Sequence, residues 1–244
     1  MGEPIASGRP GQRLGHVVLE QLKERILDGK YKPGSRISIE EVRAEFGVSK
    51  QPVMDAMRRL ESIGIVQIVP QSGCRVESYT SWEVEDFFRL FGSFESEIAA
   101  AAAARRTPDQ LDELDEAWRR IEELNTCTDS VERARRYRGL NREFHLVIHR
   151  MAHSRVMAEQ SKRMWDMSDF LINTAGPPHP LADAIVDRNH DHDVIRTAIR
   201  QQRVEVARAA MGSHITGTID HVKPVPGTSA SAGPRHGESL TESI

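Results

Sequence analysis

The chain has 244 residues, of which 28% are charged and 39% hydrophobic, and a formal net charge of −3. This composition is ordinary for a globular protein with room for two modest domains, and the acidic balance argues against a polycationic coat for nucleic acids. No apolar run approaches the roughly 18–20 residues of a membrane span, and the N-terminus lacks the order of a secretory signal. Cys74 and Cys127 lie far apart, so we expect unpaired thiols in a reducing cytoplasm.

The N-terminal part of the chain alternates short helical patterns with turns. Residues 1–13 have no periodic apolar pattern and predict a flexible leader. A first helix is expected from about Leu14 to Asp28, because apolar residues recur there at helical spacing and Gly29 ends the pattern. Ser38 is expected to cap a second helix, with Glu41 as its capping-box partner.

A third helix and a hairpin follow directly. Ser49 is expected to cap this helix, and Pro52 falls in its first turn, where the missing N–H costs little. Residues 65–69 and 74–77 read as strands joined by Pro70-Gln71-Ser72-Gly73. Three helices followed by a hairpin predict a winged helix-turn-helix unit over residues 14–79.

From Trp82 the pattern is helical almost to the end of the chain. Six helices are predicted, at about residues 82–105, 108–125, 129–152, 155–174, 181–201 and 203–221. Residues 224–244 are rich in Pro, Gly and Ser and predict a disordered tail. The fold class is therefore mainly α, with an all-α six-helix bundle over residues 80–223 that can enclose a site between facing helices.

The position of the charges, rather than their number, indicates a DNA-binding head. Residues 14–79 hold ten basic and nine acidic residues, so bulk charge does not identify a DNA binder. The third helix would enter the major groove with its polar face, while flanking arginines hold the phosphate backbone and a glycine lets the wing approach closely. The candidate DNA-binding residues are Arg36, Ser49, Lys50, Gln51, Met54, Arg58, Gly73 and Arg75.

This head resembles the GntR family of bacterial transcription regulators. The matching runs are Ile26-Leu27-Asp28-Gly29, Pro33-Gly34, Gly47-Val48-Ser49-Lys50-Gln51-Pro52-Val53, Leu60-Glu61, Gly64-Ile65-Val66 and Gly73-Cys74-Arg75-Val76. The family usually has Arg where this chain has Lys50 and Met54. Met54 cannot make a bidentate base contact, which discriminates by about 1–3 kcal/mol, so we expect an altered operator sequence rather than lost binding. The alternative is a winged helix kept for packing or for protein contacts.

Histidines on separate predicted helices form a second candidate site. Asn141 and His145 are four residues apart on one helix, so their side chains point the same way, and His192 and His214 lie on two later helices. Three converging imidazoles can bind Zn²⁺, or another divalent ion such as Ni²⁺, with coordination positions left open. A lone helical histidine is more often a packed or surface residue than a metal ligand. We therefore interpret His149, His153 and His190 as surface residues or as residues that support the ligands.

Residues 82–221 resemble the helical effector domain called FCD, of the FadR-like subfamily. The relevant runs are Asn141-Arg142-Glu143-Phe144-His145, His192 through Ile199, and Ala207 through His214-Ile215. The resemblance implies a metal held by Asn141, His145, His192 and His214. Asp is the commoner first ligand, and a neutral amide leaves the site more positive, which favours an anionic co-ligand.

The resemblance also bears on the effector. The family tends to have Arg four residues before a Glu of its first effector-domain helix, and aligning that Glu with Glu95 places Phe91 at the Arg position. The chain is therefore expected either to recognise another kind of effector or to hold it differently, and the effector-binding residues are not identified. A further group of apolar residues lines a cavity or, more simply, forms a core stripe at helical spacing: Met164, Trp165, Met167 and Phe170.

These patterns together predict a cytoplasmic transcriptional regulator rather than an enzyme. It is expected to be a homodimeric repressor that binds a double-stranded DNA operator, has no membrane contact, and is controlled by a small carboxylate effector at or near the metal. One alternative is a metal-dependent hydrolase that uses the three-histidine site, although the chain has no His-Glu-x-x-His or Gly-x-Ser-x-Gly run. The other is a DNA binder with a purely structural metal.

Overall fold

The N-terminal head combines three helices with a small antiparallel sheet. The computed structural model describes residues 10–70, 73–175, 181 and 184–222. The elements of the head are α1 (Pro10–Leu27), β1 (Arg36–Ile37), α2 (Ile39–Phe46), α3 (Lys50–Ile63), β2 (Val66–Val69) and β3 (Gly73–Val76). Their core is built from fully buried side chains of α1 and α3, among them Leu22, Ile26, Val53, Met57 and Leu60. The apolar stripes read from the sequence thus form the inner faces of these helices.

The ends of the head helices follow local chemistry. The Ser38 side chain accepts a hydrogen bond from the Glu41 N–H (3.3 Å), and Gly47 ends α2 in the left-handed region. Ser49 occupies the cap position of α3, but its side chain makes no capping hydrogen bond, so that part of the prediction is wrong. The physical reason is that Pro52, the third helical residue, has no N–H to donate to the cap.

The sheet contains one strand more than the sequence predicted. Its order is β1-β3-β2, with both pairs antiparallel, and Arg36 pairs in register with Arg75. β1 has only two residues, which is too short for an alternating pattern to be visible in the sequence. Gly73 begins β3 at φ +96°, and a Cβ there would lie 3.2 Å from the Ile37 carbonyl oxygen.

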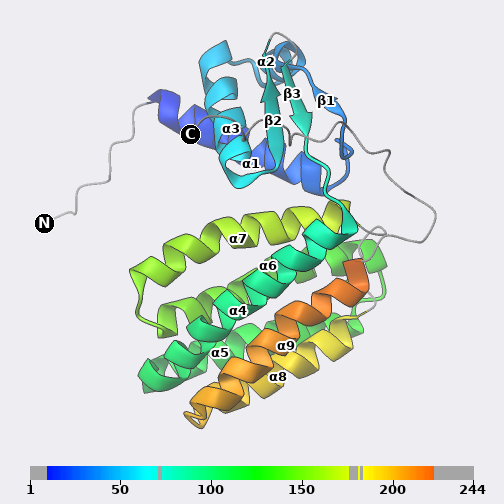
Figure 1. Cartoon of the computed structure of the whole chain (residues 1–244). Coiled ribbons are helices and arrows are strands. Elements are labelled where there is room, and N and C mark those ends of the chain that lie inside the picture. The colour runs from blue at the N-terminus through cyan, green and yellow to red at the C-terminus, as the bar shows by residue number, and fades with distance from the viewer. Residues whose placement is uncertain (1–9, 71–72, 176–180, 182–183, 223–244) are drawn as a thin grey trace, which may run out of the picture.

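The C-terminal bundle contains the six predicted helices. They are α4 (Ser81–Arg105), α5 (Pro108–Glu122), α6 (Ser130–Met151), α7 (Arg155–Thr174), α8 (Ile185–Arg200) and α9 (Val204–Val222), with a 3₁₀ turn, η1 (Glu123–Thr126), after α5. α4 runs through the centre of the bundle and packs most closely on α9 (Figure 1). Two glycines permit this approach: a Cβ at Gly92 would lie 2.9 Å from Thr216, and one at Gly212 would lie 2.7 Å from Ser96.

Several boundaries differ from the predicted ones. α1 begins at Pro10, within the predicted leader, because proline suits the first helical turn. α8 begins at Ile185 rather than near residue 181. The predicted tail, residues 224–244, lies outside the described residues, as does most of the predicted leader. None of the described helices combines the length and the apolar character of a membrane span.

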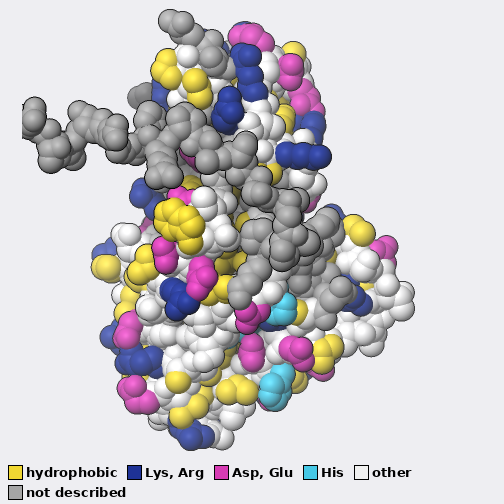
Figure 2. Space-filling view, turned by 45° about the vertical axis from the view of Figure 1, so that its right-hand side comes forward, with side chains coloured by type: hydrophobic (Ala, Val, Ile, Leu, Met, Phe, Trp, Pro, Cys, Tyr) yellow, Lys and Arg dark blue, Asp and Glu magenta, His cyan; other side chains and the backbone are white. Residues whose placement is uncertain are grey.

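The head rests on one side of the bundle. α7 is the bundle helix that lies next to α1 and α3 of the head (Figure 1). On the face shown in Figure 2, basic and acidic side chains alternate over both lobes. The charge on this face therefore forms no field of a single sign, in agreement with the near balance of charges in the head.

Candidate functional site: a buried histidine cluster below a winged head

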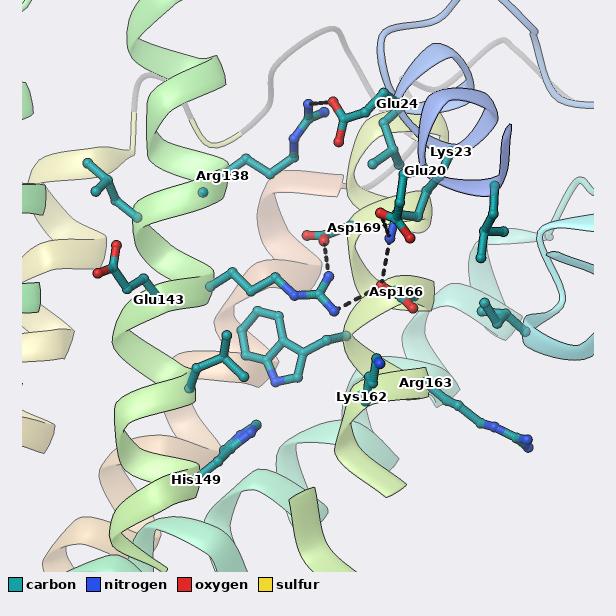
Figure 3. A pocket seen from close by; sticks show the side chains of 18 of the residues that line it. Glu20, Lys23, Glu24, Arg138, Glu143, His149, Lys162, Arg163, Asp166 and Asp169 are labelled. Atoms are coloured by element: carbon teal, nitrogen blue, oxygen red, sulfur yellow. Dashed lines mark hydrogen bonds and ion pairs between the residues drawn. The ribbon is translucent and has the colours of Figure 1, made fainter. Parts of the chain in front are cut away.

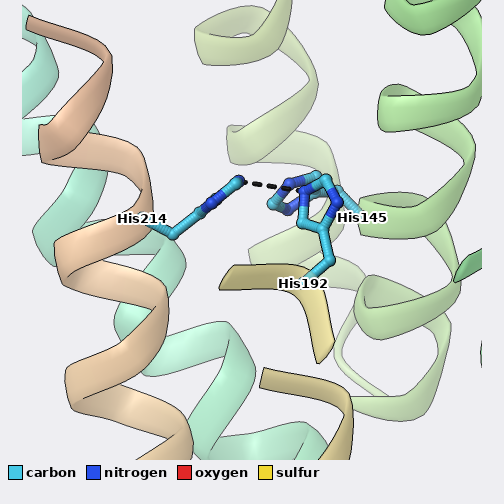
Figure 4. Close-up of side chains that lie close together, drawn as sticks. All are labelled: His145, His192 and His214. Atoms are coloured by element: carbon cyan, nitrogen blue, oxygen red, sulfur yellow. Dashed lines mark hydrogen bonds between the residues drawn. The ribbon is translucent and has the colours of Figure 1, made fainter. Parts of the chain in front are cut away.

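Three of the four predicted metal ligands meet inside the bundle. His145 comes from α6, His192 from α8 and His214 from α9, and at most 1% of each is exposed. One ring nitrogen of each lies within 4.8 Å of the others, and the Nε2 atoms of His192 and His214 are 3.1 Å apart. Figure 4 shows the three rings turned toward one another from different helices. The structure thus brings together residues that are far apart in the sequence.

Aromatic side chains hold the imidazole rings in place. Phe144 packs on His192 with ring centroids 4.4 Å apart, and Trp165 packs on His145 at 4.5 Å. Trp165 also meets Phe91 edge to face, and Phe170 is buried, so these two aromatic residues belong to the core. The core interpretation therefore holds for Phe170, whereas Trp165 packs in the core and also lines a cleft between the head and the bundle.

Two carboxylates lie next to the cluster, and Asp191 is within hydrogen-bond distance of one of its rings. Asp191 Oδ2 is 3.2 Å from Nδ1 of His214, and Glu95 Oε2 is 3.9 Å from Nδ1 of His145. A carboxylate at Nδ1 favours the tautomer whose Nε2 lone pair is free to bind a metal. Glu95 also accepts from Ser161 (2.5 Å) and lies 2.9 Å from Nε2 of His149. His149 is thus a buried support rather than a surface residue.

The electrostatics of the cluster suit a divalent cation. Burial lowers the pKa of His145, His192 and His214 well below the usual 6.5, and the Arg188 charge lowers these values further. Each ring is therefore neutral near pH 7 and offers a lone pair. Both nitrogens of His145 and Nδ1 of His192 are buried without a hydrogen-bond partner among the described residues. Imidazole nitrogens without a hydrogen-bond partner in a three-histidine cluster fit a metal such as Zn²⁺.

The fourth predicted ligand is Asn141, on the same helix as His145. The Asn141 amide oxygen accepts a hydrogen bond from the Tyr137 hydroxyl (3.3 Å) on the same helix. Tyr137, Asn141 and His145 follow one another at intervals of four, so they share one face of α6. Metal binding by Asn141 remains a prediction.

One charged residue next to the histidine cluster was not predicted from the sequence. Arg188 lies one turn before His192 on α8, and only 5% of it is exposed. Its guanidinium nitrogens lie 2.6 Å from the His214 carbonyl oxygen, 3.1 Å from Nε2 of His214 and 3.2 Å from Oγ1 of Thr218. The four-residue spacing from His192 was the available signal. The histidine site thus has a buried cation at its edge.

The predicted DNA-facing residues lie on the surface of the head. Lys50, Gln51 and Arg58 are exposed on α3, and Met54 is half-buried between them. Gln51 donates to Asp55 Oδ1 (2.8 Å), and Arg58 donates to the same atom (3.1 Å). Asp55 therefore holds two of the candidate residues on one side of the helix. Of the remaining candidates, Arg36, Ser49 and Arg75 are exposed and Gly73 is partly exposed.

A charged cleft of ≈ 1570 Å³ separates the head from the bundle. Lys23 of α1 reaches Asp166 of α7 (3.5 Å), as Figure 3 shows. Arg142 of α6 donates to Asp166 (2.9 Å) and to Asp169 (2.8 Å). Arg138, one turn earlier on α6, donates to Glu24 of α1 (2.8 Å). The helix that carries His145 is thus tied to the head by ion pairs, and Trp165 lies on both the cleft and the cluster.

The two parts of the chain match two known families. Residues 14–76 match the model for bacterial regulatory proteins of the gntR family. Residues 86–217, more than half of the chain, match the model of the FCD domain.

Relatives and solved structures agree with this assignment. The uncharacterized HTH-type transcriptional regulator YdhC of Bacillus subtilis is 25% identical over 208 residues, covering 84% of this chain and 89% of that protein. The HTH-type transcriptional repressor RspR of Escherichia coli is 25% identical over 211 residues, covering 82% and 90%. The structure of E. coli McbR/YncC aligns with a TM-score of 0.70 at 20% identity, over 86% of this chain and 96% of that one. The structure of a GntR transcriptional regulator from Rhodococcus sp. RHA1 aligns with a TM-score of 0.66 at 19% identity, over 86% of this chain and 97% of that one. At these identities the two solved structures show a shared fold.

Proposed function

The chain belongs to the gntR family of bacterial transcriptional regulators and carries an FCD domain, and from this premise we propose a repressor controlled by a small carboxylate. In this proposal residues 14–79 bind a double-stranded DNA operator, and residues 80–223 bind the metal and effector and form a homodimer in the cytoplasm. Two copies would read two half-sites of a near-palindrome, because symmetric DNA is read by symmetric protein.

The DNA-binding part of the proposal rests on the exposed face of α3 beside the wing. Lys50 and Gln51 are exposed there; Lys50 would meet phosphate or a guanine edge, and Gln51 would meet adenine or phosphate. Arg36 and Arg75 are exposed and pair in register on neighbouring strands, so both would reach the same stretch of phosphate backbone. The Ser49 hydroxyl makes no capping hydrogen bond and lies at the N-terminus of α3, where helices favour phosphate.

The sensing part rests on the histidine cluster, which is the observation that carries the proposal. His145, His192 and His214 would hold the metal, with Asn141 as a further ligand. Asp191 would keep the His214 ring oriented, and the Glu95 carboxylate lies 3.9 Å from Nδ1 of His145. When bound, the metal supplies positive charge and open coordination positions for an anionic oxygen.

Ion pairs across the cleft provide the route from the effector to the DNA. Residues 138, 142 and 145 lie within two turns of α6, so a shift of this helix at the cluster also moves Arg138 and Arg142. Arg138 holds α1 directly, and Arg142 holds it through Asp166 and Lys23. An effector that binds one position of α6 more tightly would thereby bias the placement of the heads.

The hydrolase alternative is less well supported by the geometry. Glu143 is turned toward Arg120 (2.5 Å) rather than toward the cluster. Glu95, Ser161 and His149 contact one another, but the Glu95 carboxylate (2.9 Å) and the Ser161 hydroxyl (3.4 Å) meet the same ring nitrogen, Nε2 of His149, and all three residues are buried. A nucleophilic triad instead needs histidine between the acid and the serine.

The proposal is tested by operator binding with the full chain. DNA from upstream of the protein's own gene would be labelled, and its affinity measured for metal-loaded protein, for chelator-treated protein and with added small carboxylic acids. We expect tight binding to this DNA and at least one acid that weakens it only when the metal is present. An acid effect that persists after chelation would favour a purely structural metal, and a protein that ignores this DNA under every condition would overturn the proposal.

A further inference from the structure

Asp55 is a carboxylate on the side of α3 that carries the candidate DNA-binding residues. Its Oδ1 atom accepts a hydrogen bond from Nε2 of Gln51 (2.8 Å) and another from Nη1 of Arg58 (3.1 Å). Gln51 lies four residues before Asp55 and Arg58 three residues after it, so the three side chains are neighbours on the helix surface. An acidic group close to DNA phosphates is electrostatically unfavourable, so its presence here needs a physical reason.

The base of the Asp55 side chain is fixed where α3 packs on α1. A Cβ at Gly15 of α1 would lie 3.9 Å from Cβ of Asp55, which is van der Waals distance, so the two helices meet at this point. The Asp55 side chain is 45% exposed, and its carboxylate reaches the two exposed residues from this edge. Arg58 supplies a counter-charge, so the pair together repels phosphate much less than a lone carboxylate would.

The Asp55 carboxylate decides which way round the Gln51 amide lies. An ionised carboxylate only accepts hydrogen bonds, so the amide nitrogen, and not the amide oxygen, must face it. The amide oxygen and the second N–H are left for another partner, which gives one acceptor beside one donor. Without the carboxylate, the amide can turn over and offer its N–H groups to any acceptor.

Adenine is the base whose major-groove edge matches a side-by-side acceptor and donor, because its N6 donates and its N7 accepts. Guanine and phosphate offer only acceptors, and cytosine offers only a donor, so each leaves half of the oriented amide unmatched. Gln51 is the second residue of α3, and the N-terminal residues of a recognition helix are those that reach base edges. Arg58 lies seven residues further on, about 10 Å along the helix, and would meet another part of the duplex.

We infer that Asp55 is a positioning residue that makes Gln51 a reader of adenine. The inference rests on the proposed function in one respect, namely that the outer face of α3 enters the major groove. It goes further by choosing adenine over phosphate as the partner of Gln51, and by naming the residue that enforces this choice. Asp55 acts through Gln51 and does not itself bind a base.

The test selects binding sites for the full chain from a pool of random duplex DNA. The wild type, Gln51→Ala, Asp55→Ala and the double variant each undergo selection, and affinities are then measured with every base pair at each position of the selected site. The position at which Gln51→Ala loses base preference marks the Gln51 contact. We expect the wild type to prefer adenine over guanine there by at least about fivefold. Asp55→Ala should lose this preference, and the double variant should match Gln51→Ala, because Asp55 acts only through the amide.

A positioning role is separated from a structural one by the base preference itself. Alanine favours helix, so Asp55→Ala is expected to fold, and loss of an acidic group should not weaken binding to every sequence alike. Glu40→Ala is the matched control, because it removes an exposed helical carboxylate that pairs with an arginine three residues on. This control should keep the wild-type preference for adenine.

Three outcomes overturn the inference: an unchanged adenine preference in Asp55→Ala, a base other than adenine or no base preference that depends on Gln51, or a loss that Glu40→Ala reproduces. A uniform fall in affinity for all sequences in Asp55→Ala overturns it as well, since that would show a structural role. A wild type that selects no sequence refutes the proposed function and the inference with it. A selected operator whose adenine preference is independent of Asp55 refutes the inference alone.

Discussion

Lys23 of the head and Arg142 of the bundle donate to one shared atom, Oδ1 of Asp166, over 3.5 and 2.9 Å. Only 10–24% of each of these three side chains is exposed, so solvent screens the contact less than it would screen a surface ion pair. Arg142 precedes His145 by three residues on α6. A single carboxylate thus connects the first helix of the head with the helix that enters the histidine cluster.

Asp166→Asn is expected to weaken the response of DNA binding to the effector. The amide keeps the shape of the side chain but loses the charge that attracts Lys23 and Arg142, at a cost of about 1–3 kcal/mol in unfolding free energy. The ratio of operator affinities with and without effector should move toward one, while metal content stays the same. Glu40→Gln is a control, because Glu40 pairs with Arg43 within the head. An unchanged ratio in Asp166→Asn would refute this route.

Lys50→Ala should weaken operator binding and reduce its dependence on salt. Each phosphate neutralised by a lysine contributes about 0.9 to the slope of log affinity against log salt, so the slope should fall by about 0.9 per half-site. Fluorescence anisotropy at several salt concentrations measures it. Arg89→Ala, on the exposed surface of α4, should leave the slope unaltered. If Lys50→Ala has the wild-type affinity and slope, another face of the head meets DNA.

Removal of one imidazole is expected to abolish metal binding and its stabilising effect. A metal at 100 times its dissociation constant stabilises the native state by about 2.7 kcal/mol, so chelation should lower the melting temperature of the wild type by several degrees. His192→Ala should contain little metal and should not respond to chelator. His190→Ala changes an exposed histidine two residues earlier on the same helix and should behave as the wild type does. Full metal content in His192→Ala would contradict the ligand assignment.

The pH dependence of stability should reveal Asp169. Burial raises its pKa from 3.8 to about 6, against the opposing effect of Arg142. Between about pH 4 and 6 the native state therefore holds a proton that the unfolded chain has released. The proton on Asp169 therefore stabilises the native state at low pH. The unfolding free energy falls by up to about 1.4 kcal/mol per pH unit as the pH rises through this window, and Asp169 causes no further change above about pH 6.

Urea titrations from pH 4 to 7 measure this effect as a difference between variants. Asp169→Asn has no proton to lose at this position. The unfolding free energy of the variant minus that of the wild type should therefore increase as the pH rises from about 4 to about 6. Asp112→Asn, an exposed change on α5, should follow the wild type. A pH-independent difference between Asp169→Asn and the wild type would mean that Arg142 outweighs burial at this carboxyl.

Much of the fold was predictable because its signals are local. The stripes Leu22–Ile26 on α1 and Val53–Leu60 on α3 show their period in the sequence, and Gly47 ends α2 where a left-handed residue is needed. β1 was not predictable, because two residues are too few to show an alternating pattern. In addition, Arg75, which pairs with Arg36 of β1, lies far along the chain. The missing side-chain cap at Ser49 follows from Pro52, which leaves no N–H at the third helical position for the cap to bind.

The histidine site divides in the same way. Sequence by itself determined that His145, His192 and His214 stand on three helices, and that α3 has a polar outer face, because helical spacing decides which side chains share a face. Only the tertiary structure decided that these rings meet, that Glu95 and Asp191 stand behind them, and that Arg188 enters the site. Those relations depend on how α4, α6, α8 and α9 pack across the core, and side-chain packing between distant segments leaves no period in the chain.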